Sequence, residues 1–373
     1  MKTLKTTLIA FTFFALTSCN KSNNDNTTNP QPAVSGQITT LAGTGAAGNV
    51  NGPGATAQFS DLLGVCVDSN GNVFVVDREY HCIKKITPAG VVSLFAGSAT
   101  GDIGNTDSSV GSNAKFNFPN GICIDTNNNL FVADAYNHCI RKITPSGAVS
   151  TFCGQKGTRA NDDNTGVLAG FSDPEGICID NQNNLYVAEA GVGRVRKITP
   201  AGVVTTLAGV SLSPPFSSYT TSHADGVGSA ARFGTLMGGI TTDNAGNIYV
   251  GEGGVYFSIR KIEIASKNVT TIAGNGEIDA LGVEDDGVGI NCKAGPDGMC
   301  FDGQGNIMFT SYGSVRKLSL SDAKVTTITR NPNQNKPDGN LNDSGFTFVS
   351  QIAYRNGKFY VTEDRKVRIL TLN

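Results

Sequence analysis

Three residues with oxygen-bearing side chains stand at equivalent places in repeated stretches of this sequence. Asn120, Glu175 and Asp297 each precede a glycine at the start of a short apolar run. Amide and carboxylate oxygens are ligands of hard divalent cations, and such a cation can polarise a carbonyl group for hydrolysis. The alternative is that these polar residues solvate the entrance of a channel. Either role requires a fold that brings positions far apart in the sequence to one axis.

The three histidines of the chain are of two kinds. His81 and His138 follow the acids Asp77 and Asp134 at the same distance, which indicates a repeated structural bend. His223 lies outside that pattern, and the sequence has no Gly-x-Ser-x-Gly, His-Glu-x-x-His or phosphate-loop motif. Spacing alone therefore identifies no catalytic constellation.

The longest variable segment, residues 210–232, is a candidate binding loop. It carries Phe216, Tyr219 and His223, and aromatic side chains supply much of the contact energy at binding sites. The alternative is a flexible loop without a binding role.

Two Asp-Gly clusters, at residues 225–228 and 285–289, could offer carboxylate and carbonyl oxygens to calcium. They lack the regular acidic spacing of a calcium loop, and Asp-Gly is also common in turns. We therefore favour turns at both places.

A repeat sets the positions of all these residues. The stretch NGICIDTNNNLFVADAYNHCIRKITPSGAVSTFCG, residues 120–154, recurs in closely or loosely similar form. The other copies, the last of which is truncated, are residues 63–97, 175–209, 238–274, 297–328 and 350–373.

Each copy predicts four short antiparallel strands, A to D. Apolar residues recur with a period of two between Gly, Asn and Pro bends, a pattern typical of hairpins. The C–D bend of the first three copies is Thr-Pro-x-Gly, in which proline fixes φ and glycine begins the next strand. One position of the A–B bend holds residue types that tolerate the left-handed conformation: Gly71, Asn128, Asn183, Gly246, Gly305 and Gly357.

Four-stranded units of this kind bury both faces of their sheets when they stand radially around an axis. The last copy ends after strand C, whereas residues 36–43, GQITTLAG, resemble a strand D and precede the first copy. We therefore predict an all-β, six-bladed β-propeller of four-stranded antiparallel blades. The N-terminal strand should complete the C-terminal blade and remove open sheet edges. The D–A links and B–C bends should share one face, which we call the long-loop face.

The pattern P-N-G-I-C-I-D-x-x-N-N-L-F-V-A-D-x-x-N-H-x-I-R-K-I-T-P-x-G closely resembles the NHL repeat. Asn137 and His138 stand at its Asn-His pair, which is lost in the later copies. The resemblance extends over residues 36–373 and implies the propeller fold. It implies no single activity, because NHL propellers include interaction modules, RNA binders, lyases and bacterial lipoproteins.

Residues 1–18 resemble the signal peptide of a bacterial lipoprotein. MKTLKTTLIAFTFFALTSC has two lysines, an apolar run and Leu-Thr-Ser before Cys19. The resemblance implies that Cys19 is lipidated, and the alternative is an ordinary secretory peptide with a chance cysteine. Residues 19–35 are polar and asparagine-rich, in a Bacteroidetes-like style, and predict a flexible tether. We expect a cell-envelope protein, lipid-anchored at the outer membrane on its periplasmic or surface-exposed side.

The charge balance argues against a nucleic-acid partner. The chain has 29 Lys and Arg residues against 31 Asp and Glu residues, for a formal net charge of -2. A mildly acidic exported protein lacks the basic surface that phosphate contacts need.

The nine cysteines do not predict a disulfide framework. Equivalent positions of neighbouring blades should be too far apart for a bridge, so we interpret these cysteines as small buried apolar residues. Cysteines that share a strand position between blades are Cys66, Cys123, Cys178 and Cys300 in strand A, and Cys82 and Cys139 in strand C.

Two function classes are left. The first is a binding or interaction scaffold, monomeric and without a cofactor, that presents the long-loop face to a protein, peptide or glycan ligand. The alternative is a metal-dependent hydrolase or lyase, gluconolactonase-like or amidating-lyase-like, with calcium or another divalent metal at the channel mouth or zinc on histidines. An enzyme needs an acid or base within reach of the metal, whereas a binder needs exposed aromatic residues. The sequence supplies the aromatic residues more plainly, which favours the scaffold.

Overall fold

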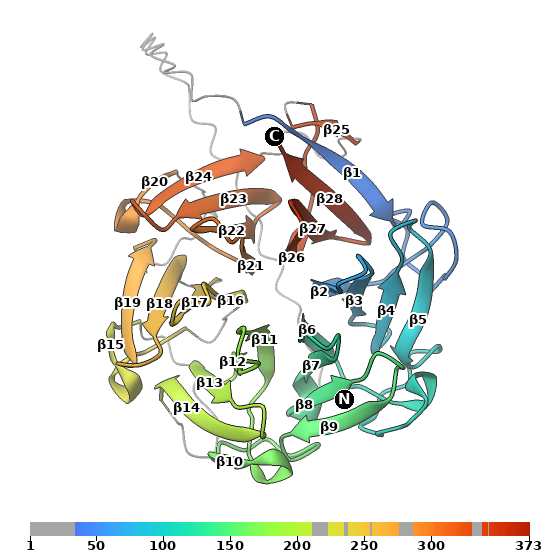
Figure 1. Cartoon of the computed structure of the whole chain (residues 1–373), viewed down its shortest axis with the longest axis horizontal. Coiled ribbons are helices and arrows are strands. Elements are labelled where there is room, and N and C mark those ends of the chain that lie inside the picture. Colours follow the sequence, from blue (N-terminus) through green and yellow to red (C-terminus); the bar gives the residue numbers. More distant parts are fainter. Residues whose placement is uncertain are drawn as a thin grey trace, which may run out of the picture. The chain divides into compact units, whose positions relative to one another are not determined.

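The computed structural model describes residues 34–210, 223–234, 238–253, 256–275, 286–329, 338–341 and 343–373. Six antiparallel sheets of four or five strands stand around a common axis (Figure 1). Within each sheet, strand A lies nearest the axis and strand D near the rim. The predicted six-bladed β-propeller is confirmed.

The first three blades take strands A to D from consecutive segments. Blade 1 consists of β2 (Leu62–Val67), β3 (Val73–Asp77), β4 (Cys82–Ile86) and β5 (Val92–Gly97). Blade 2 consists of β6 (Pro119–Ile124), β7 (Leu130–Asp134), β8 (Cys139–Ile143) and β9 (Val149–Cys153). Blade 3 consists of β11 (Pro174–Ile179), β12 (Leu185–Glu189), β13 (Arg194–Ile198) and β14 (Val203–Gly209).

The next three blades follow the same order, with one exception in blade 6. Blade 4 consists of β16 (Ile240–Thr242), β17 (Asn247–Glu252), β18 (Ser258–Glu263) and β19 (Asn268–Ala273). Blade 5 consists of β21 (Gly298–Phe301), β22 (Asn306–Ser311), β23 (Ser314–Ser319) and β24 (Lys324–Thr329). Blade 6 consists of β26 (Val349–Arg355), β27 (Lys358–Glu363), β28 (Lys366–Leu372) and β1 (Gly36–Ala42).

Short elements decorate the links between blades. Two-residue strands pair with strand D in blades 3 to 6: β10 (Asn164–Thr165), β15 (Gly226–Val227), β20 (Gly287–Val288) and β25 (Gly339–Asn340). Single 3-10 turns are η1 (Gly111–Asn113), η2 (Ala135–Asn137), η3 (Gly166–Leu168), η4 (Gly228–Ala230) and η5 (Gly289–Asn291).

The ring is closed by pairing between the two ends of the described chain. β1 runs antiparallel to β28, with Gly36 opposite Leu372 and Ile38 opposite Leu370. Ile38 is fully buried in a core cluster formed by side chains of blades 5 and 6. The predicted closure by the N-terminal strand is therefore confirmed.

Burial follows the depth of a strand in its blade. Every residue of β3 and of β12 is buried, because both faces of these strands are covered by neighbouring blades. In β14, near the rim, buried and exposed residues alternate over the first residues only. Successive residues of an inner strand therefore pack against the two neighbouring blades in turn. Only near the rim does one face of the strand become exposed to solvent.

The bends have the predicted conformation. Asp125 Oδ1 accepts the backbone N–H groups of Asn127 and Asn129 at 2.9 and 2.7 Å, which fixes an Asx turn between strands A and B of blade 2. Positive φ values are found at all six predicted A–B positions: Gly71, Asn128, Asn183, Gly246, Gly305 and Gly357.

Glycines let the innermost strands approach each other backbone to backbone. A Cβ atom at Gly121 would lie 2.4 Å from the carbonyl oxygen of Glu175 in the next blade. A Cβ atom at Gly64 would lie 2.5 Å from the carbonyl oxygen of Asn120. A side chain at either position would push neighbouring blades apart.

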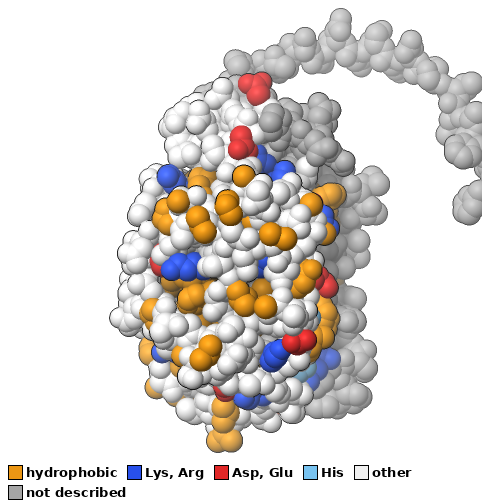
Figure 2. All heavy atoms as spheres, turned by 90° about the vertical axis from the view of Figure 1, so that its right-hand side faces the viewer, with side chains coloured by type: hydrophobic (Ala, Val, Ile, Leu, Met, Phe, Trp, Pro, Cys, Tyr) orange, Lys and Arg blue, Asp and Glu red, His pale blue; other side chains and the backbone are white. Residues whose placement is uncertain are grey.

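The outer edge of the ring carries small groups of apolar side chains between polar surface, as Figure 2 shows for one side. In the part of the chain that the structure describes, no helix has the length and apolarity needed to cross a membrane.

Candidate functional site

Exposed aromatic side chains are present on the long-loop face. Among the described residues, the large exposed hydrophobic side chains include three aromatic ones: Tyr136 at 51%, Tyr312 at 57% and Phe348 at 69% exposure. Tyr136 and Tyr312 lie in the B–C bends of blades 2 and 5, and Phe348 ends the link into strand A of blade 6. All three therefore belong to one face of the ring.

The exposed ring of Tyr136 rests on a packed support. It lies 4.9 Å from the ring of Phe118, centre to centre, and Phe118 in turn contacts the imidazole of His81 edge-on at 4.6 Å. The guanidinium carbon of Arg78 lies 5.4 Å from the centre of the Phe118 ring. These contacts hold an aromatic surface in place before any ligand arrives.

The predicted channel-mouth residues lie at the beginning of innermost strands. Asn120 lies in β6 and Glu175 in β11, both half-buried, whereas exposed Asp297 directly precedes β21. Asn120 and Glu175 thus stand in adjacent blades, and Asp297 belongs to the blade across the axis from blade 2. The described His, Cys, Asp and Glu side chains form no group of three or more that could hold a metal ion.

Glu175 has a perturbed carboxyl group. Burial raises its pKa to about 7, since the opposing attraction of Arg78 is weaker and Asp173 adds repulsion. A carboxyl group with this pKa can exchange a proton near neutral pH. This makes Glu175 the strongest candidate for acid–base chemistry at the mouth.

His223 has contacts inside blade 4. Its Nδ1 atom lies 2.8 Å from Glu252 Oε2 and its Nε2 atom 3.2 Å from Thr271 Oγ1. The imidazole also stacks on the ring of Tyr256 at 5.4 Å. These contacts give His223 a structural role, and its use in ligand binding stays a prediction. Phe216, Tyr219 and Cys19 lie outside the described residues.

A column of buried ion pairs in each blade is a feature that our sequence reasoning missed. The third residue of strand C is a buried base, and in blade 2 this residue is Arg141. Its guanidinium contacts Asp134 at the end of strand B at 2.8 Å and Asp107 in the preceding link at 2.6 Å. It also lies over the ring of Phe116 at 5.0 Å. The equivalent bases of the other blades are Lys84, Arg196, Arg260, Arg316 and Arg368.

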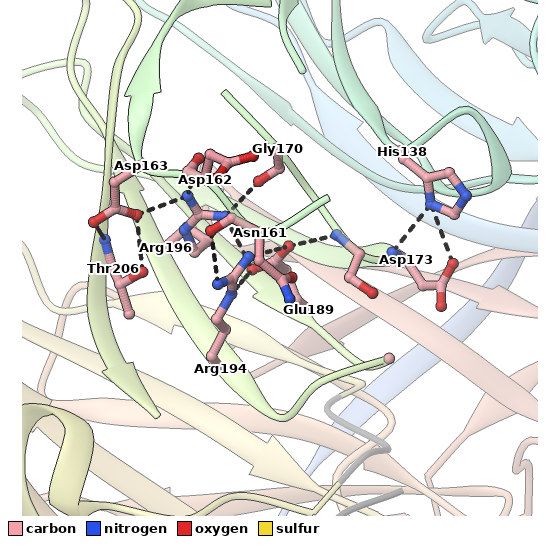
Figure 3. Close-up of polar contacts among 12 residues, drawn as sticks. His138, Asn161, Asp162, Asp163, Gly170, Asp173, Glu189, Arg194, Arg196 and Thr206 are labelled. Atoms are coloured by element: carbon pink, nitrogen blue, oxygen red, sulfur yellow. Dashed lines mark hydrogen bonds and ion pairs between the residues drawn. The ribbon is translucent and has the colours of Figure 1, made fainter. Parts of the chain in front are cut away.

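Blade 3 carries a second buried arginine (Figure 3). Arg194 and Arg196 both pair with Glu189, and Arg196 also contacts Asp163 at 2.8 Å. Arg194 further donates to the carbonyl oxygen of Asn161 at 3.1 Å. These groups lie inside the blade, so we assign them to the stability of the fold. The repeated base in strand C and the repeated Asp in the links are the sequence signals that could have revealed the columns.

The two Asp-Gly clusters contribute to the same columns. Asp225 Oδ1 accepts hydrogen bonds from Arg260 and Thr271 at 2.9 and 3.0 Å. Asp286 Oδ1 accepts them from Arg316 and Thr327 at 3.2 and 2.6 Å. A calcium ion would have to displace a buried guanidinium group from each carboxylate. The geometry therefore agrees with turns that hydrogen bonds attach to the strands of their blade.

The eight described cysteines are free and buried. Those of strand A include Cys123, and burial raises the pKa of its thiol well above the usual value. These thiols are thus neutral, apolar side chains, as their positions in the repeat predict.

The repeats are matched by a family model described as NHL repeat, over residues 59–86, 116–143 and 171–198. Each match runs from the end of a D–A link through strands A, B and C of blades 1 to 3. The chain is a six-bladed β-propeller that contains NHL repeats.

Known relatives agree with this assignment. The bovine NHL repeat-containing protein 2 is 24% identical over 322 residues, which are 79% of this chain and 43% of that protein. The chain spans less than half the length of the curated relatives it matches.

Solved structures share the fold. An auxiliary nutrient binding protein from Bacteroides thetaiotaomicron is 14% identical with a TM-score of 0.64, covering 90% of this chain and 76% of that one. A gluconolactonase from Xanthomonas campestris is 13% identical with a TM-score of 0.56, covering 91% and 90%. At these identities the likeness establishes the fold alone.

Proposed function

We propose that this chain is a lipid-anchored, extracytoplasmic binding propeller whose long-loop face contacts a glycan, peptide or partner protein. The observation that carries the proposal is that the exposed aromatic side chains Tyr136, Tyr312 and Phe348, from blades 2, 5 and 6, all belong to that face. Aromatic residues are enriched among the side chains that dominate binding energy. Each presents an apolar surface that a ligand can cover.

Two further points support the proposal. Tyr136 is held by Phe118 and therefore loses little conformational freedom when a ligand binds. The fold is shared with a nutrient binding protein from Bacteroides, and the expected acylation of Cys19 would keep such a binder in the cell envelope.

A binding screen tests the proposal. The full chain is incubated with an array of oligosaccharides and polysaccharides and with a peptide library, and hits are measured by calorimetry. The triple variant Tyr136→Ala, Tyr312→Ala and Phe348→Ala should bind a true ligand with an affinity at least tenfold lower. Val91→Ala with Val203→Ala, which removes exposed apolar side chains near the C–D turns, should leave the affinity unchanged. Equal losses in both variants, or no hit at all, would contradict the proposal.

The predicted loop residues enter the same test. Phe216→Ala and Tyr219→Ala should each weaken the binding free energy of the ligand by about 1 to 3 kcal/mol if the 210–232 segment takes part in binding. Unchanged affinity in both variants would restrict the site to the described aromatic residues.

The second candidate function is a metal-dependent hydrolase or lyase at the channel mouth, and the raised pKa of Glu175 favours it. Calcium or another divalent ion near Asn120, Glu175 and Asp297 would polarise a carbonyl group of the substrate. The test is a lactonase or lyase activity that a chelator inhibits. If Glu175→Gln and Asp297→Asn each abolish such an activity, the enzyme hypothesis is supported and the scaffold hypothesis is rejected.

A further inference from the structure

The axis of the ring holds a cavity that opens away from the long-loop face. Its volume is about 510 Å³, within the range of small-molecule sites. Its walls are the aliphatic, thiol and aromatic side chains of strand A, such as Ile122, Cys123 and Ile124 of blade 2. The lining reaches Asn244 in the A–B turn of blade 4 and Arg355 at the end of β26, and it does not include the channel-mouth residues. The cavity therefore belongs to the face formed by the A–B and C–D turns, which we call the short-turn face.

Blade 6 departs from the repeat at the rim of this cavity. In the other blades strand A is followed by an Asp that closes an Asx turn: Asp68, Asp125, Asp180, Asp243 and Asp302. In blade 6 the equivalent residue is Arg355, which pairs directly with Lys358 across a two-residue turn. Both turn residues, Asn356 and Gly357, have positive φ, so the turn needs no Asp to close it.

The charge of Arg355 is not balanced by any of the described residues. No hydrogen bond or ion pair joins its guanidinium group to another residue in the part of the chain that the structure describes, and its buried Nε–H has no acceptor. A half-buried cation without a partner costs free energy that an anion could recover.

The acids at equivalent positions of other blades are already engaged. Asp243, which also lines the cavity, accepts hydrogen bonds from Ala245, Asn247 and Tyr249. In the two neighbouring blades, Asp68 and Asp302 accept the backbone N–H groups of their own turns. Arg355 is thus the free charge among the described residues that line this cavity.

We propose that the axial cavity binds a small amphipathic carboxylate, with its apolar body between the strand-A side chains and its carboxylate on Arg355. Burial of the apolar body between aliphatic and thiol groups drives binding. A paired carboxylate and guanidinium at the rim then fixes the orientation and excludes cationic amphiphiles. This site is separate from the proposed binding face, because the two lie at opposite ends of the axis.

Calorimetry with ten-carbon probes tests the site. Decanoate, below its micelle concentration, should bind the full chain with a stoichiometry of one, and decyltrimethylammonium of equal chain length at least tenfold more weakly. Arg355→Gln should weaken decanoate about tenfold or more. Arg365→Gln, which removes a partly exposed arginine paired with Asp364 in the B–C bend of the same blade, should leave the decanoate affinity unchanged.

A second variant probes the apolar walls. Ala353→Leu fills part of the cavity and should weaken the binding of decanoate. Both Ala353→Leu and Arg355→Gln should still unfold in a cooperative thermal transition, which shows that the variants are folded. Full decanoate affinity in both variants, several molecules bound per chain, equal binding of the ammonium probe, or no binding to the unmodified chain would overturn the proposal. None of these results depends on the ligand of the long-loop face.

Discussion

The imidazole Nδ1 atom of His138, in the B–C bend of blade 2, accepts the backbone N–H of Asp173, the residue before strand A of blade 3, at 3.3 Å. His81 does the same one blade earlier, accepting the N–H of Phe118 at 3.1 Å. All four residues have positive φ, so each histidine joins two strained bends of neighbouring blades. The repeated histidine is therefore a latch between blades, which gives physical content to the predicted structural bend.

Loss of a latch should lower stability. His138→Asn keeps a residue that tolerates the left-handed conformation but shortens the acceptor, so the N–H of Asp173 is left without its partner. We expect a loss of about 1 to 2 kcal/mol in urea unfolding. His81→Asn should add independently, since it acts at another blade junction. Unfolding midpoints equal to that of the unmodified protein would contradict a stabilising role of these histidines.

The buried arginines should differ in importance between blades. Arg141→Met leaves buried Asp134 without a positive partner and should cost about 3 to 5 kcal/mol. Arg196→Met should cost clearly less, because Glu189 keeps its pair with Arg194. Chemical denaturation of the two variants measures the difference, and an equal loss in both would contradict the assigned pairing.

Glu175 should make stability depend on pH. Its pKa is raised from 4.5 to about 7 in the folded protein, so the folded state binds more protons than the unfolded state between those values. Stability should then fall as the pH rises from about 4.5 to 7, by roughly 2 to 3 kcal/mol from this group. Glu175→Gln should remove that component, which thermal melts at pH 5 and pH 8 would detect.

A matched change separates this effect from general acid sensitivity. Glu79→Gln alters an exposed acid in the B–C bend of blade 1 and should keep the same pH dependence as the unmodified protein. The assignment fails if Glu175→Gln and Glu79→Gln give parallel curves.

Removal of the closing strand should open the ring. Deletion of residues 36–43 takes away the partner of β28 and exposes its hydrogen-bonding edge. We expect a lower melting temperature and self-association in size-exclusion chromatography. A monomer with unchanged melting would be evidence against the importance of closure.

The lipid anchor is tested by labelling. Cys19→Ala should abolish incorporation of radioactive fatty acid and release the protein from membranes, because no other residue at that place can be acylated by the lipoprotein pathway. Labelling equal to that of the unmodified protein would refute the anchor.

The sequence by itself determined the strands, the turns and the number of blades. These features depend on neighbours within a few residues: alternating apolar positions, Asn or Gly at positions of positive φ such as Asn128 and Gly357, and a strand D that stands before the first copy. Repetition then made each local prediction stronger, because the same pattern had to fit six times.

Only the tertiary structure decided which side chains meet. Arg141 contacts Asp107 across a link, and His138 reaches Asp173 in another blade, so neither contact has a local pattern. The free charge of Arg355 depends likewise on what surrounds the cavity in all six blades. Burial and charge balance are properties of the closed ring, and the distances and pKa values that follow from them arise only when the chain has folded.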